Sequence, residues 1–131
     1  EVHDEEPVYY LWTAISTPVK NPRGYRFIMG RHLQQYCVED LSRMQVGLRS
    51  YLAHSWPNGF AQFLFHHDRC GRYLDDLTAY TFCLELGQQV LQYRELGDNP
   101  DAERLKAAVR VLDRLASDIE ATYRDSGKQP Q

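Results

Sequence analysis

The feature of this sequence that most constrains its fold is an amphipathic segment with helix-end signals near the C-terminus. Asn99 is a favoured N-cap residue, Pro100 suits the first helical position, and Asp101 suits the positive end of the helix dipole. We predict a helix that starts here and ends by Gly127. Apolar residues recur along it at the spacing of one helix face: Leu105, Val109, Leu112, Leu115, Ile119 and Tyr123.

Helical spacing also describes the middle of the chain. It predicts a helix over residues 31–54, ended by Pro57 and the Asn58–Gly59 turn, and then a third element over 60–96, bent at Gly71. The third element has apolar residues on two sides, which is typical of a central helix or of one shared with a partner. One stripe contains Tyr73, Leu77, Tyr80, Leu84 and Leu91, and the other contains Ala79, Phe82, Cys83, Leu86, Val90 and Tyr93.

The N-terminal part has a different character. Residues 8–16 and 25–30 are rich in aromatic and β-branched side chains, and Pro, Asn and Gly residues separate them. This pattern favours a β-hairpin, with a short helix over 8–16 as the alternative. We therefore expect a mainly α fold, with three to four helices in a small bundle and a short N-terminal β-hairpin or extended segment. We expect one mostly helical domain over residues 8–126, between a flexible acidic arm (1–7) and a flexible tail (127–131).

Composition narrows the class of protein. The chain has 131 residues, the size of one ordinary domain, and its net charge of −3 does not favour a nucleic-acid-binding protein. Three cysteines cannot form a closed set of disulfides, which favours a reducing, cytoplasmic location. The sequence contains no apolar run of the length that a membrane span requires, so we expect no membrane association.

The densest group of chemically active residues is the run FHHDRCGRYLDD, from Phe65 to Asp76. On a helix, His66 and Cys70 would share one face, as a metal-ligand pair or a Cys/His catalytic pair would require. Structural zinc needs four ligands, however, and no second close pair or nucleophile motif accompanies these two residues. A small metal-binding protein or Cys/His enzyme is therefore an alternative only. We predict no enzymatic activity and no cofactor.

A basic stretch precedes the predicted helix at residue 31. It interleaves cations with Tyr25 and Phe27, a mixture that suits phosphate contact together with stacking. Weak anion or nucleic-acid binding is therefore a second alternative, although so few cations on a net-acidic chain favour a charged, solvated loop. The candidate anion-binding residues are Lys20, Arg23, Arg26 and Arg31.

The aromatic content gives the preferred hypothesis. Phe, Trp and Tyr make up 12% of the chain, and Tyr and Trp are enriched at protein interfaces. We predict a protein–protein interaction module, a small regulator of the antiactivator or adaptor type that masks a surface of another protein and forms a homodimer. The predicted partner-binding residues come from the N-terminal aromatic cluster and the two-sided helix: Tyr9, Tyr10, Trp12, Tyr80, Phe82, Leu84, Leu86, Val90 and Tyr93.

Overall fold

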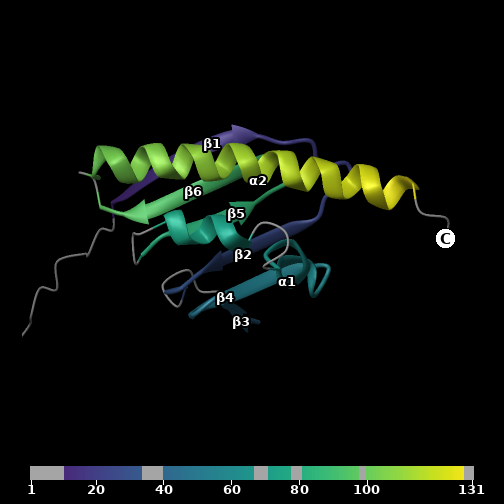
Figure 1. The fold of residues 1–131 in the computed structure, drawn as a ribbon, viewed down its shortest axis with the longest axis horizontal. Helices are drawn as coiled ribbons and strands as arrows, with labels where there is room; N and C mark the ends of the chain where they lie inside the picture. Colours follow the sequence, from purple (N-terminus) through teal and green to yellow (C-terminus); the bar gives the residue numbers. More distant parts are fainter. Residues whose placement is uncertain (1–10, 34–39, 67–70, 78–80, 98–99, 129–131) are drawn as a thin grey trace, which may run out of the picture.

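The centre of the protein is a six-stranded antiparallel β-sheet with the strand order β1-β6-β5-β2-β4-β3 (Figure 1). The structure is a computed structural model, and it describes residues 11–33, 40–66, 71–77, 81–97 and 100–128. Two hairpins, β3–β4 and β5–β6, flank the central strand β2, and β1 returns to pair with β6 at one edge. The strands are β1 (Trp12–Pro18), β2 (Arg26–Gly30), β3 (Ser42–Val46), β4 (Arg49–Trp56), β5 (Cys83–Leu86) and β6 (Val90–Leu96).

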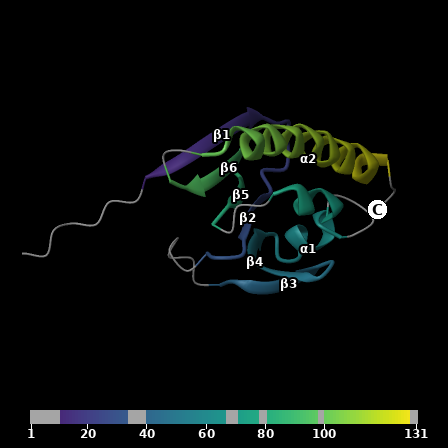
Figure 2. The same ribbon diagram turned by 60° about the vertical axis from the view of Figure 1, so that its left-hand side comes forward.

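The helices pack on one face of this sheet (Figures 1 and 2). The long helix α2 (Ala102–Lys128) crosses β1 and β6, and the short helix α1 (Phe60–Leu64) lies against β4 and β2. A 3-10 helix, η2 (Gly71–Asp76), lies beside α2. Because side chains alternate across a strand, each strand sends every second residue into the core under these helices.

The core is rich in aromatic rings that contact one another edge to face or stacked. The Phe27 and Phe65 ring centroids are 5.3 Å apart at 89°, and Phe82 stacks on Tyr93 with centroids 6.2 Å apart. Such pairs stabilise a core beyond the area that they bury. Helix α2 closes the core with Ala108, Val111, Leu112, Leu115 and Ile119, all of which are buried.

The prediction of a mainly α bundle is wrong, because one sheet and one long helix dominate the fold. Residues 83–96 show the physical reason. They form the β5–β6 hairpin, in which Leu84, Leu86, Leu91 and Tyr93 point into the core on alternate positions. Residues two apart in sequence lie about 200° apart on a helix, so strand alternation gives two opposite stripes when it is plotted on a helix. The two apolar stripes that predicted a central helix therefore came from the alternation of these two strands.

The helix predicted over 31–54 is also wrong. Residues 42–56 form the β3–β4 hairpin, whose two-residue turn consists of Gly47 and Leu48. Gly47 has φ +61°, the left-handed conformation that favours glycine in such turns. Leu48, which the predicted helix would have contained, is fully exposed at the tip of the turn.

The N-terminal segment is extended, as predicted, but its pairing differs from the prediction. Strands β1 and β2 form where aromatic and β-branched residues suggested them, yet they do not pair with each other. Strand β1 pairs with β6, and the β5–β6 hairpin lies between β1 and β2. The alternative of a short helix is wrong for residues 12–16, which lie in β1. The predicted arm, residues 1–7, lies outside the described residues.

The C-terminal helix is confirmed, with changes at its start, on its apolar face and at its end, where it continues through Gly127 to Lys128. The described helix begins at Ala102, and the carboxylate of Asp101 accepts a 2.7 Å hydrogen bond from the Glu103 backbone N–H, as an N-cap residue does. Asn99, the predicted cap, lies outside the described residues. Val109 was expected in the apolar stripe but is exposed, because the buried face is centred on Ala108, Val111 and Leu115.

The helices of the described chain include none that is both long and apolar enough to cross a membrane.

Candidate protein-binding surface

The second face of the sheet carries the side chains that alternate with the core residues. On β4 these are Leu52, His54 and Trp56, and they lie beside Ile28 and Arg26 of β2. None of the described helices packs on this face. The sheet therefore presents a broad surface of mixed apolar and charged side chains to solvent.

Trp56 is the most exposed aromatic residue on this face. Its side chain is 64% exposed, although it ends a strand whose other face is in the core. Arg26 is its cross-strand partner, and the Arg26 guanidinium carbon lies 4.7 Å from the centroid of the Trp56 ring. This cation–π contact orders two large side chains at the surface.

Two hollows adjoin this pair, and both include Arg26, Trp56 and Gln88 in their walls. The first, of about 540 Å³, lies over the sheet, and its walls also include Ile28, His54, Glu85 and Arg94. The second, of about 660 Å³, lies between the β1–β2 connection and the β5–β6 turn, and its walls also include Arg23 and Tyr25. We call these nine residues the Trp56 surface: Arg23, Tyr25, Arg26, Ile28, His54, Trp56, Glu85, Gln88 and Arg94.

A buried asparagine fixes the shape of the second hollow. The side-chain amide of Asn21 donates hydrogen bonds to the carbonyl oxygens of Tyr25, at 2.8 Å, and of Gly87, at 2.9 Å. It thereby joins the β1–β2 connection to the β5–β6 turn, and the Val19 N–H bonded to the Gln89 carbonyl reinforces this junction. Buried, satisfied polar groups of this kind hold one arrangement of a loop. Both walls of the hollow are therefore held in place before anything binds.

Tyr25 packs against the core. Its ring makes an edge-to-face contact with Phe60 of α1, with centroids 5.0 Å apart, and Phe60 is buried. The guanidinium carbon of Arg23 lies 5.9 Å from the Tyr25 centroid, and both residues line the second hollow. Two arginine–aromatic pairs, Arg23–Tyr25 and Arg26–Trp56, thus stand at the same hollow.

The first hollow has a different electrostatic character because it contains an acid. Arg94 donates a 2.7 Å hydrogen bond to the carboxylate of Glu85, its neighbour on the uncovered face. His54 in the same hollow contacts the backbone oxygen of Asp40 through Nδ1 at 2.9 Å. In the first hollow the charge of Glu85 is therefore balanced by that of Arg94. The second hollow is lined by two arginines and by no acidic residue.

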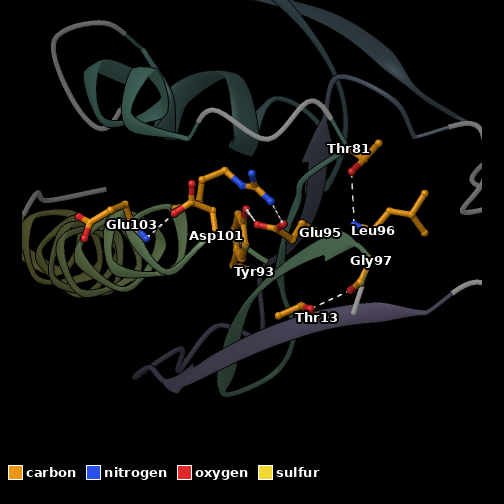
Figure 3. A network of polar contacts seen from close by, with 9 residues as sticks. Thr13, Thr81, Tyr93, Glu95, Leu96, Gly97, Asp101 and Glu103 are labelled. Carbon is orange, nitrogen blue, oxygen red and sulfur yellow. Dashed lines mark hydrogen bonds and ion pairs between the residues drawn. The ribbon is translucent and has the colours of Figure 1, made fainter. Parts of the chain in front are cut away.

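A second polar cluster joins β6 to α2 (Figure 3), and its Tyr93 and Glu95 side chains are buried. The Tyr93 hydroxyl donates a 2.6 Å hydrogen bond to one oxygen of Glu95, and Arg104 donates a 2.7 Å hydrogen bond to the other. Burial, and then the hydrogen bond to Glu95, raises the pKa of Tyr93, while the hydrogen bond to Glu95 raises the pKa of Arg104. Glu95 is only 2% exposed, so water and solutes do not reach its carboxylate. The cluster ties α2 to β6 and is a structural feature.

The structure separates the predicted partner-binding residues into three groups. Phe82, Leu84, Leu86 and Tyr93 are buried in the core, so the described structure presents none of them to a partner. Trp12 and Val90 lie on β1 and β6 and point to the same uncovered face as Arg94. Tyr9, Tyr10 and Tyr80 lie outside the described residues.

The predicted anion-binding residues do not converge on one site. Arg26 begins the five-residue strand β2 and Arg31 follows its last residue, so about 17 Å of extended chain separates them. Lys20 faces a different hollow, which Glu120 of α2 also lines, and its backbone N–H donates to that carboxylate. Only Arg23 and Arg26 come together, at the second hollow.

The predicted metal or catalytic pair cannot be assembled from the described residues. His66 is exposed just after α1, and Cys70 lies outside the described residues. Within the ranges that the structure describes, no group of three or more His, Cys, Asp or Glu side chains could hold a metal ion.

Sequence reasoning missed Trp56 and His54 because it placed residues 31–54 in a helix and Trp56 at the break that follows it. The signal that could have found them is the alternation in YLAHSW, where Tyr51, Ala53 and Ser55 are buried and the residues between them are not. No protein-family model, curated protein or solved structure matches this chain.

Proposed function

We propose that this chain is a non-enzymatic protein-interaction module that binds another protein through the Trp56 surface. The observation that carries the proposal is the Arg26–Trp56 pair, exposed beside two hollows on a sheet face that no described helix covers. Trp, Tyr and Arg are the residue types that dominate binding energy at protein interfaces. A small regulator of the antiactivator or adaptor type would use such a surface to cover a face of its partner.

The chemistry of the surface supports this class over an enzyme. The first hollow lies over the sheet and the second lies between two loops, and the side chains that they share are an aromatic ring, a guanidinium and an amide. In the Tyr93–Glu95–Arg104 cluster the Tyr93 and Glu95 side chains are buried, so we assign the cluster no substrate.

The proposal can be tested by affinity capture from native extract with the full chain, its Trp56→Ala variant and its Val109→Ala variant. Val109 is a matched control because it is an exposed apolar residue on the outer side of α2. We expect a partner that the full chain and Val109→Ala capture equally and that Trp56→Ala loses. Mass measurement of the intact assembly then separates a second copy of this chain from a different protein. Equal capture by all three chains, or capture by none, would refute the proposal.

A further inference from the structure

We infer that the segment of the partner that docks on the Trp56 surface is acidic, with a carboxylate bound by Arg26 at the second hollow. This inference rests on the proposed function, and it names the chemistry of the partner. The occupant is a stretch of polypeptide that carries Glu or Asp beside an apolar side chain, the latter packing against Trp56.

The balance of charge at this surface is opposite to that of the whole chain. The walls of the two hollows contain three arginines, Arg23, Arg26 and Arg94, and one acid, Glu85, which gives a net charge of +2. The chain as a whole carries −3. The second hollow has Arg23 and Arg26 in its wall and no acidic residue. Complementary potential steers a partner of the opposite sign toward such a patch and fixes its orientation.

Arg26 has a geometry that suits a carboxylate. Its guanidinium lies over the Trp56 ring, and among the described residues it makes no ion pair. A guanidinium that lies over a ring keeps N–H donors in its own plane that match the two oxygens of a carboxylate. Arg94 differs, because its guanidinium already donates to Glu85.

The frame around the hollow keeps the cost of binding low. Asn21 holds both turns that form its walls, and Phe60 holds the Tyr25 ring. Binding to a preorganised surface requires little ordering of side chains and loops, so more of the contact energy appears as affinity. The indole of Trp56 offers the incoming segment an apolar contact beside the charged one.

A nucleic acid is the competing class of ligand, and the number of cations argues against it. Affinity for a phosphate backbone comes from many Lys and Arg contacts made along the strand. Here only two of the predicted cations, Arg23 and Arg26, line the same hollow, and Arg31 and Lys20 lie elsewhere. A short acidic peptide segment needs only such a small cluster.

The inference is tested with the full chain carrying Trp12→Phe, which leaves Trp56 as its one tryptophan. The probes are a soluble peptide with Glu pairs flanking a central Leu, the same peptide with Gln in place of each Glu, and single-stranded oligothymidine. We expect a saturable change in Trp56 fluorescence with the Glu peptide, which weakens as salt is added, and none with the Gln peptide. Arg26→Gln should weaken binding by about tenfold, and Arg110→Gln, at an exposed site on α2, should not.

Equal binding of the Glu and Gln peptides, no binding of either, or preferential binding of oligothymidine would overturn the inference. The proposed function would survive these results if a protein captured from extract still depended on Trp56. In that case Arg26→Gln would leave capture of that protein unchanged, which separates failure of the acidic-segment inference from failure of the interaction module itself.

Discussion

Arg26 and Trp56 are direct cross-strand partners of β2 and β4, and the Arg26 guanidinium carbon lies 4.7 Å from the centroid of the Trp56 ring. The residues beside them, Phe27 and Ser55, form the next pair of the same register and point into the core. The register that buries Phe27 therefore also places an arginine and a tryptophan together at the surface. The proposed binding surface is a direct consequence of the fold of these two strands.

The Glu95–Arg104 pair predicts an asymmetry between two substitutions. Arg104→Met leaves the carboxylate of Glu95, 2% exposed, without its cation, whereas Glu95→Gln leaves Arg104, which is 35% exposed and can turn toward water. Breaking a buried pair by removing one partner costs about 3–5 kcal/mol, and the partial exposure of Arg104 favours the low end of this range. We expect Arg104→Met to lower the free energy of unfolding more than Glu95→Gln does at neutral pH. Urea unfolding measures both, and the reverse order would show that Glu95 is not stabilised by Arg104.

The Tyr93 phenol predicts a loss of stability at alkaline pH. Burial, and then the hydrogen bond to Glu95, raises the pKa of Tyr93 in the folded state, whereas the pKa of a tyrosine in the unfolded chain is about 10. Above that pH the unfolded state binds fewer protons than the folded state, so the free energy of unfolding falls by about 1.4 kcal/mol per pH unit from this group. The contribution is fully present below the unfolded pKa.

Tyr93→Phe removes this contribution. We expect the variant to lose about 1 kcal/mol at neutral pH, because the hydrogen bond to Glu95 is lost, but to lose less stability than the parent chain above about pH 10. Unfolding in urea across this pH range gives the two slopes. Tyr51→Phe should flatten the slope in the same direction, since burial also raises the pKa of Tyr51. Identical slopes for the parent and Tyr93→Phe would contradict the assignment.

Gly30, at the end of β2, predicts a steric effect that tests the packing of the sheet. A Cβ atom there would lie 2.6 Å from the backbone oxygen of Phe82 and 3.1 Å from Leu33 Cδ2. We expect Gly30→Ala to lower the free energy of unfolding by about 1–3 kcal/mol. Gly87→Ala is the control, because its nearest contact of 3.7 Å is ordinary, and it should be neutral or stabilising by about 0.4–1 kcal/mol. Thermal unfolding of both variants measures the difference. A Gly30→Ala variant as stable as the parent chain would mean that β2 and Phe82 are not this close.

The parts of the fold that the sequence predicted correctly are those in which local pattern and tertiary structure agree. Helix α2 has end signals and a 3.6-residue repeat over many turns, so its existence followed from residues such as Asp101, Leu112 and Leu115. The hairpins did not follow, because short strands of alternating residues also fit helical spacing. Gly47, with its left-handed backbone, was the decisive signal at the β3–β4 turn, and strand order depends on contacts distant in sequence that no local pattern specifies.

The candidate site could be predicted only in part for the same reason. Arg23 and Arg26 stood out as cations near Tyr25, and they do meet at the second hollow. Trp56 is thirty positions from Arg26 in the chain, so only the β2–β4 pairing brings it to that arginine. Leu84, by contrast, was predicted at the surface from the two-stripe pattern and lies in the core.

The most direct test of the central claim is site-specific photo-crosslinking in cells, with a photoreactive phenylalanine derivative placed at Trp56 or, as the control, at Val109. Both positions are exposed, but only the first belongs to the Trp56 surface. The proposed function predicts a discrete crosslinked species with a second protein chain from position 56 and none from position 109. Crosslinking from both positions alike, or from position 109 alone, would contradict it.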